Sequence, residues 1–173
     1  MVTQEDANHV RTALDGGLAG GRVVGVETGA CPHTAVREDP TMNLVTVAEM
    51  EARWPESELV LIESGGDNLT LTFSPALVDY FVYVIDVAAG DKIPRKNGPG
   101  ITHSNLLVIN KEDLTPYVGA SMDIMRRDAA IMRPSKPTLV TSCQTGAGLR
   151  EVAATITHDV LFTELVSTDV SHS

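Results

Sequence analysis

Five short segments of the chain are apolar and rich in β-branched residues, and each is six or seven residues long. Most of them lack the strict alternation of apolar and polar positions that a half-exposed strand shows. This pattern is typical of parallel strands that are buried on both faces of a sheet. The predicted strands are Arg22–Glu27, Glu58–Ser64, Tyr80–Asp86, Asn105–Asn110 and Pro137–Ser142.

Four further segments have apolar residues at helical spacing or clear start and stop signals, such as a proline just beyond the last turn. The predicted helices are Gln4–Leu14, Thr41–Arg53, Ala120–Met132 and Gly148–Glu164. Strands that alternate with helices predict an α/β fold, with a mostly parallel sheet flanked by helices. We expect one domain over residues 1–166, followed by a frayed polar tail over residues 167–173.

Composition and charge exclude several classes of protein. The chain has 173 residues, a net charge of −10 and 43% hydrophobic residues, as in a globular domain. The acidic balance argues against a nucleic-acid partner, which requires a basic surface. No apolar run approaches the length of a transmembrane helix and the first residues do not resemble a signal peptide, so we expect a cytoplasmic protein without a membrane partner.

The clearest motif is "NKED", which follows directly after the apolar run "LLVI". A carboxylate at Asp113 can accept two parallel hydrogen bonds from the N1 and N2 edge of guanine. Adenine lacks that pair of donors. Asn110 would tie neighbouring loops together, and the stem of Lys111 would cover the base. The alternative is a polar turn that happens to end a strand, but the position at a strand end favours guanine recognition.

A second motif, "SCQTGAGL", follows the last predicted strand and leads into a helix. A backbone N–H there, from Cys143 or a neighbour, could reach O6 of guanine. The signal is weak alone, because any junction between a strand and a helix favours glycine and threonine. The Cys143 thiol itself is better explained as a small buried group than as a reactive one.

A third motif is "ESGGDN", at the end of the second predicted strand. Glu63 is placed to hold Mg²⁺ through water, and Gly66 could bring a backbone N–H to a γ-phosphate. The alternative is an ordinary turn. The later segment "GDKIPRKNGPG" gathers four charged residues in a loop, and a solvated loop is as good an explanation as a docking site for a partner.

The sequence "CPH" places Cys31 and His33 two residues apart, after a glycine turn. Thiolate and imidazole are both metal ligands, and the intervening proline stiffens the turn so that both can face one point. Two ligands are too few for most metal sites, so a structural role for either residue remains open from the spacing alone.

Four strings together closely resemble the family of urease accessory GTPases, and the resemblance extends from about Thr3 to the last helix. They are "VETGACPHTAVREDPTMNL", "LVLIESGGDNLT", "YVIDVAAGDKIPRKNGPGIT" and "LLVINKEDL". The resemblance implies binding of GTP and Mg²⁺, and delivery of Ni²⁺ to the urease apoprotein with other accessory proteins. The alternative within this class is the GTPase that inserts nickel into hydrogenases.

The same resemblance implies a homodimer in which Cys31 and His33 of two chains supply four ligands to one Ni²⁺, with Zn²⁺ as a possible substitute. It also implies that Asp39 lies near the Mg²⁺ and the switch region. The family has an N-terminal strand, a phosphate loop G-x-x-x-x-G-K-[ST] and a helix, none of which is found in these residues. We therefore expect an N-terminally truncated P-loop domain without GTPase activity; the alternatives are a metal-binding docking module and a non-functional copy.

Overall fold

The structure is a computed structural model that describes residues 5–14, 22–27, 34–64 and 72–162. The chain divides into two compact units, Met1–Val78 and Asp79–Ser173, and each is described by itself.

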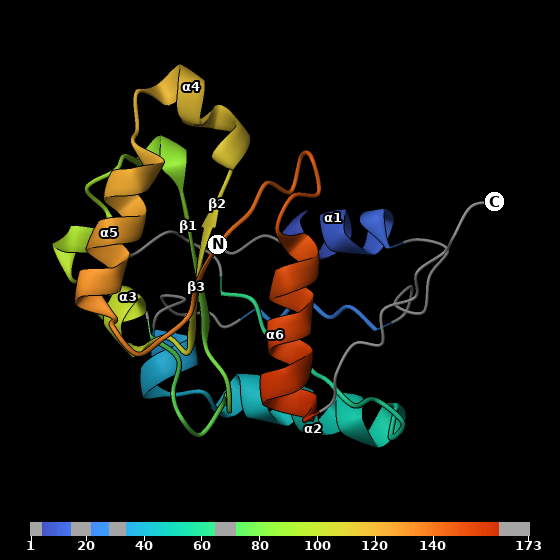
Figure 1. Ribbon diagram of the computed structural model, residues 1–173. Helices are drawn as coiled ribbons and strands as arrows, with labels where there is room; N and C mark the ends of the chain where they lie inside the picture. Colours follow the sequence, from blue (N-terminus) through green and yellow to red (C-terminus); the bar gives the residue numbers. More distant parts are fainter. Residues whose placement is uncertain (1–4, 15–21, 28–33, 65–71, 163–173) are drawn as a thin grey trace. The chain divides into compact units, whose positions relative to one another are not determined.

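A three-stranded parallel sheet forms the centre of the second unit (Figure 1). Its strands are β1 (Val82–Asp86), β2 (Leu106–Asn110) and β3 (Thr138–Val140), in the spatial order β1-β2-β3. The register pairs Asp86 of β1 with Asn110 of β2, so both strands end at the same level. The last three strands predicted from the apolar pattern are confirmed, with shorter bounds.

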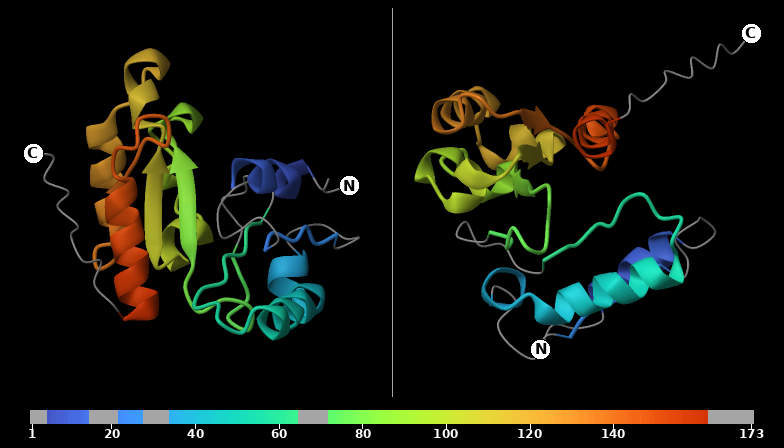
Figure 2. Two further views of the ribbon diagram at one scale, coloured as in Figure 1. Left: turned by 90° about the vertical axis from the view of Figure 1, so that its right-hand side faces the viewer. Right: turned by 90° about the horizontal axis from the view of Figure 1, so that it is seen from below.

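Two long helices cover this sheet, α5 (Met122–Met132) on one face and α6 (Leu149–Leu161) on the other (Figures 1 and 2). Both confirm helices that the sequence predicts. Shorter helices fill the connections between strands: η2 (Val87–Ala89), η3 (Pro94–Lys96), α3 (Pro99–His103), η4 (Glu112–Leu114) and α4 (Thr115–Val118). A hydrogen bond of 2.8 Å from the Tyr80 hydroxyl to Asp159 Oδ2 joins α6 to the segment before β1.

The core of the second unit lies around β2, the middle strand. Leu106, Leu107 and Ile109 are fully buried, because helices or loops cover both faces of this strand. β1 differs, since Tyr83 and Ile85 are buried while Val84 between them is 57% exposed. β1 thus shows the alternation of a strand with one covered face.

The first unit contains helices and no strand, within the residues that the structure describes. These are α1 (Glu5–Ala13), the π-helical turn η1 (Thr34–Glu38) and α2 (Thr41–Arg53). The two helices confirm the predictions at these positions. Trp54 ends α2, and the guanidinium of Arg53 lies over its ring, 4.6 Å from the centroid.

The predicted strands Arg22–Glu27 and Glu58–Ser64 are wrong, because neither segment forms a strand in the structure. A strand exists only where its backbone N–H and C=O groups bond to a neighbouring strand. The apolar pattern reports burial of side chains but cannot supply that neighbour. In the described part of the chain the only sheet is the three-stranded one of the second unit.

Candidate functional site

The loops after β2 and β3 meet at one end of the sheet (Figure 1). The Asn110 side chain joins them. Its side-chain oxygen Oδ1 accepts a hydrogen bond of 3.1 Å from the Thr141 hydroxyl and one of 3.2 Å from the Cys143 N–H. The Glu112 N–H donates to the Thr141 carbonyl at 3.1 Å, which adds a backbone link. In the structure Asn110 therefore bridges the end of β2 and the loop after β3.

Asp113 is held by the same two loops. The hydroxyl of Ser142, which is buried, donates to Asp113 Oδ1 at 2.5 Å. A carboxylate can accept about four hydrogen bonds, so Ser142 fixes its orientation and leaves acceptor capacity for a ligand. The Ser142 hydroxyl also accepts from the Thr145 N–H at 3.2 Å, which orders the loop around it. Ser142 is a functional candidate that sequence reasoning missed.

Lys111 has a left-handed backbone, with φ of 62°, and its ammonium donates to Asp86 Oδ2 at 2.8 Å. This hydrogen bond lowers the pKa of the Asp86 carboxyl and raises the pKa of Lys111. Asp86 also accepts from the Ala89 N–H at 3.0 Å and so caps η2. Sequence reasoning missed Asp86, although an acidic residue at the end of the neighbouring apolar run was a visible signal.

The loop between β3 and α6 directs one backbone N–H, that of Cys143, to the Asn110 side chain. The Cys143 N–H already donates to Asn110, so contact with guanine O6 would require this group to share its hydrogen atom. Within residues 143–147 of this loop, the N–H of Gln144 is the one that finds no acceptor among the described residues. The Cys143 side chain is exposed, so the prediction that it is buried is wrong. The thiol lies on a loop that turns away from the core.

Gly148 begins α6 with a left-handed backbone, at φ of 72°. A Cβ atom at this position would lie 2.1 Å from the Val140 carbonyl oxygen. Only glycine fits this close approach, which brings the loop back against the end of β3.

The remaining predicted site residues belong to the first unit. Asp39 Oδ1 accepts from the Thr41 hydroxyl at 2.6 Å and from the Thr41 N–H at 3.2 Å, and the hydroxyl contact chiefly lowers the pKa of Asp39. Glu63 is exposed. The candidates Cys31, His33 and Gly66 lie outside the described residues. Elsewhere in the described part of the chain, no three potential metal-binding side chains lie together.

This arrangement can recognise the edge of a flat heterocycle. It combines an oriented carboxylate, a fixed amide and a lysine stem at the carboxyl ends of parallel strands, where α/β sheets bind their ligands. No helix in the described residues is long and apolar enough to cross a membrane. Fold and site together define a nucleotide-binding α/β domain.

Comparisons with known proteins specify this class further. A family model described as "CobW/HypB/UreG, nucleotide-binding domain" matches residues 1–140. The urease accessory protein UreG of Yersinia pestis is 59% identical over 165 residues, which are 95% of this chain and 75% of that protein. UreG 2 of Methylorubrum populi is 62% identical over 162 residues, which are 94% of this chain and 75% of that protein. The chain therefore belongs to the CobW/HypB/UreG family and, within it, to the urease accessory branch.

Two solved structures share the fold. The hydrogenase maturation factor HypB of Archaeoglobus fulgidus has a TM-score of 0.65 at 23% identity, covering 90% of this chain and 83% of its own. HypB of Helicobacter pylori, solved in complex with nickel, has a TM-score of 0.71 at 15% identity, covering 96% of this chain and 74% of its own. These likenesses confirm the α/β fold with a parallel sheet flanked by helices.

Proposed function

We propose that this chain recognises guanine nucleotides and acts as a urease accessory protein that helps to deliver nickel to the urease apoprotein. The observation that carries the nucleotide part is the cluster at the ends of β2 and β3, in which Ser142 orients Asp113 and Asn110 joins the two loops. The urease part follows from relatives named urease accessory proteins at 59% and 62% identity.

In the proposed complex, Asp113 accepts hydrogen bonds from N1 and N2 of guanine, and the stem of Lys111 lies along the base. The carboxylate fits guanine because it only accepts hydrogen bonds, and the N1 and N2 edge of guanine presents two donors. Fewer groups are available to bind the triphosphate, since none of the four lysines in these 173 residues ends a phosphate-binding glycine loop. Recognition of the base and hydrolysis of the nucleotide are thus separable properties of this chain.

Mg²⁺ would be held, when bound, near Asp39, Glu63 and Gly66. Asp39 keeps lone pairs beyond its two contacts with Thr41, and the exposed Glu63 carboxylate can reach a hydrated ion. Mg²⁺ supplies charge neutralisation to the phosphates. Support for these positions comes from the resemblance and from the chemistry of the carboxylates.

Nickel is the cargo in this proposal, and Cys31 and His33 are its proposed ligands. A pair of ligands from each of two chains makes a four-ligand set that suits Ni²⁺, and a two-fold axis supplies it without further residues. The proposal therefore includes a homodimer, other urease accessory proteins as partners, and a cytoplasmic location.

The test of guanine recognition is an NMR titration of ¹⁵N-labelled chain with guanosine, adenosine and xanthosine monophosphates. GMP should shift the amide signals of residues 110–113 and 142–145, and AMP should not. Asp113→Asn should reverse the preference toward XMP, because an asparagine can donate to the 2-oxo group of xanthine. Asp123→Asn, an exposed aspartate on α5, is the matched control. Equal shifts with GMP and AMP would refute the proposal.

A further inference from the structure

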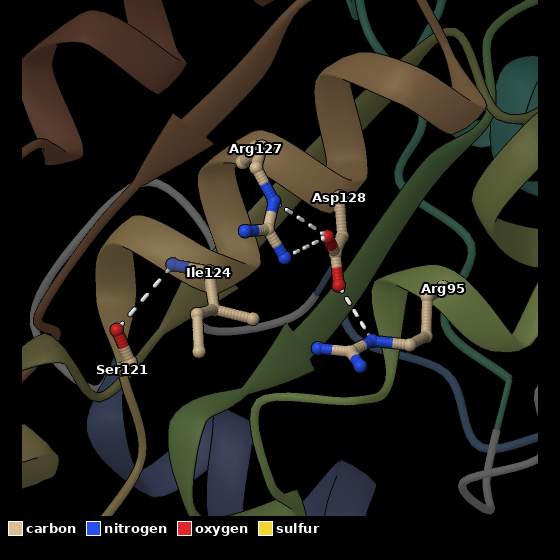
Figure 3. A network of polar contacts seen from close by, with 5 residues as sticks. All are labelled: Arg95, Ser121, Ile124, Arg127 and Asp128. Carbon is tan, nitrogen blue, oxygen red and sulfur yellow. Dashed lines mark hydrogen bonds and ion pairs between the residues drawn. The ribbon is translucent and has the colours of Figure 1, made fainter.

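A pair of arginines shares one buried carboxylate in the second unit (Figure 3). Asp128 on α5 has a side chain that is only 6% exposed. Its Oδ2 accepts from Arg95 Nε at 2.6 Å, and its Oδ1 accepts from Arg127 Nε at 3.1 Å and from Arg127 Nη2 at 2.9 Å. These contacts lower the pKa of Asp128, with the hydrogen bonds from Arg127 as the largest cause.

The carboxylate neutralises only one of the two guanidinium charges. Among the residues that the structure describes, Arg95 donates only through Nε and Arg127 donates through Nε and Nη2. Most of the ten N–H donors of the pair therefore make no hydrogen bond to these residues. Both side chains remain open to solvent, at 43% and 62% exposure. Asp128 therefore holds two guanidinium groups in place and leaves them available to a further anion.

The surroundings extend the positive charge. Lys96 follows Arg95 on η3, and Arg126 precedes Arg127 on α5; both are exposed and have no ion-pair partner among the described residues. Residues 92–136 contain eight basic and four acidic side chains, a local charge of +4 within a chain of −10. The charge is therefore unevenly distributed along the sequence, and this segment is basic although the whole chain is acidic.

An apolar side chain adjoins these charges. Ile131 lies one helical turn after Arg127 on α5 and is 64% exposed. A small anion such as phosphate gains nothing from an exposed isoleucine, whereas a protein partner buries it. The mixture of arginine and isoleucine on one helix face is typical of protein interfaces, where arginine is enriched.

We propose that Arg95, Lys96, Arg126, Arg127 and Ile131 form a docking surface for an acidic, partly apolar segment of a partner protein. The shared carboxylate orients the two arginines before binding, which reduces the entropy lost when the partner's carboxylates pair with them. This surface adds a docking site to the proposed function, and it would stand even if guanine recognition failed.

The test uses a fluorescein-labelled 15-residue peptide rich in glutamate and leucine, and the same peptide with glutamine in place of glutamate. Fluorescence anisotropy measures binding to the full chain. The glutamate peptide should bind at least about tenfold more tightly than the glutamine peptide, and its binding should weaken as salt is added. Equal binding of the two peptides, or no binding of either, would overturn the proposal.

The double variant Arg126→Glu/Arg127→Glu should weaken binding of the glutamate peptide by about tenfold or more. Arg126→Glu alone leaves the contacts of Asp128 with Arg95 and Arg127 intact, and it should still weaken binding of the glutamate peptide severalfold. This single variant keeps the test valid if the double variant misfolds. Arg150→Glu on α6, an exposed arginine with the same change of charge, is the matched control and should change binding by less than about twofold. An equal loss in the control would indicate net charge alone.

Two further outcomes would reassign the surface. Displacement of the peptide by millimolar inorganic phosphate would indicate a site for small anions. A mass measured by light scattering that falls to a monomer only in the double variant would indicate a second copy of this chain as the occupant. The GMP titration should be unchanged in all these variants, so a failure here is distinct from a failure of guanine recognition.

Discussion

Arg133 is the buried cation on which we expect the second unit to depend most. Arg133 follows the last residue of α5. Its Nη1 donates to the Ile101 carbonyl at 2.8 Å and to the Ser104 hydroxyl at 2.7 Å. Nη2 donates to the carbonyls of Ser104 and Asn105, at 3.2 and 3.0 Å. Arg133 is only 3% exposed and has no carboxylate partner among the described residues. Burial lowers its pKa from the ordinary value.

Two opposing effects decide the result of Arg133→Met. Each hydrogen bond from a charged donor contributes about 1.5–3 kcal/mol, and the substitution leaves buried carbonyl oxygens without a donor. Removing the guanidinium also relieves the desolvation of an unpaired charge, which offsets part of this loss. Methionine retains much of the apolar stem. We expect the lost hydrogen bonds to dominate, with a net loss of about 3–5 kcal/mol in the free energy of unfolding.

Lys136→Met is the matched control. The Lys136 ammonium also donates to carbonyls of the same turn, those of Thr102 at 2.9 Å and His103 at 3.1 Å, but this lysine is exposed. Water can replace an exposed donor, so we expect a loss of less than about 1 kcal/mol. The pair of variants therefore compares a buried cation that donates four hydrogen bonds with an exposed cation that donates two to the same turn.

The assay must report on the second unit. Trp54 is the one tryptophan of the sequence and belongs to the first unit, so its fluorescence is unsuitable. Amide hydrogen exchange of β2, at Leu106–Asn110, measures the opening of the buried strand directly. A loss below about 1 kcal/mol for Arg133→Met, or equal losses in both variants, would refute the reasoning.

Three further predictions concern the turn before α6, hydrolysis and metal binding. Gly148→Ala should destabilise the second unit by at least about 2 kcal/mol in urea unfolding, because it adds a clash to backbone strain. Gly146→Ala is the control: its φ is 83°, but no atom lies within 4 Å of the new Cβ, so it should destabilise the unit less. Equal losses of stability in the two variants would contradict this prediction. The purified 173-residue chain should release no phosphate from GTP above a buffer control, since no lysine follows a glycine loop. Calorimetric titration should give one Ni²⁺ per two chains. The affinity for Ni²⁺ should be lower in acid, because the thiolate and the imidazole become protonated. A one-to-one stoichiometry, or unchanged affinity in Cys31→Ala, would contradict the shared site.

Resemblance at the level of sequence identified the family, and local patterns predicted the α/β class, three of the strands and the long helices. The runs that became β1, β2 and β3 have strong apolar patterns, and a strand end followed by "NKED" was sufficient to propose the role of Asn110. These features are local, because side-chain periodicity and turn residues act within a few positions of the chain.

The pairing of the apolar runs and the contacts between distant side chains depend on the tertiary fold. Residues 22–27 and 58–64 have the composition of strands but form none, since pairing depends on a neighbour that local pattern cannot supply. The contacts of Asp86 with Lys111 and of Ser142 with Asp113 join residues 25 and 29 positions apart. They exist because parallel strands of matched register end together, which is a property of the sheet and not of any one segment.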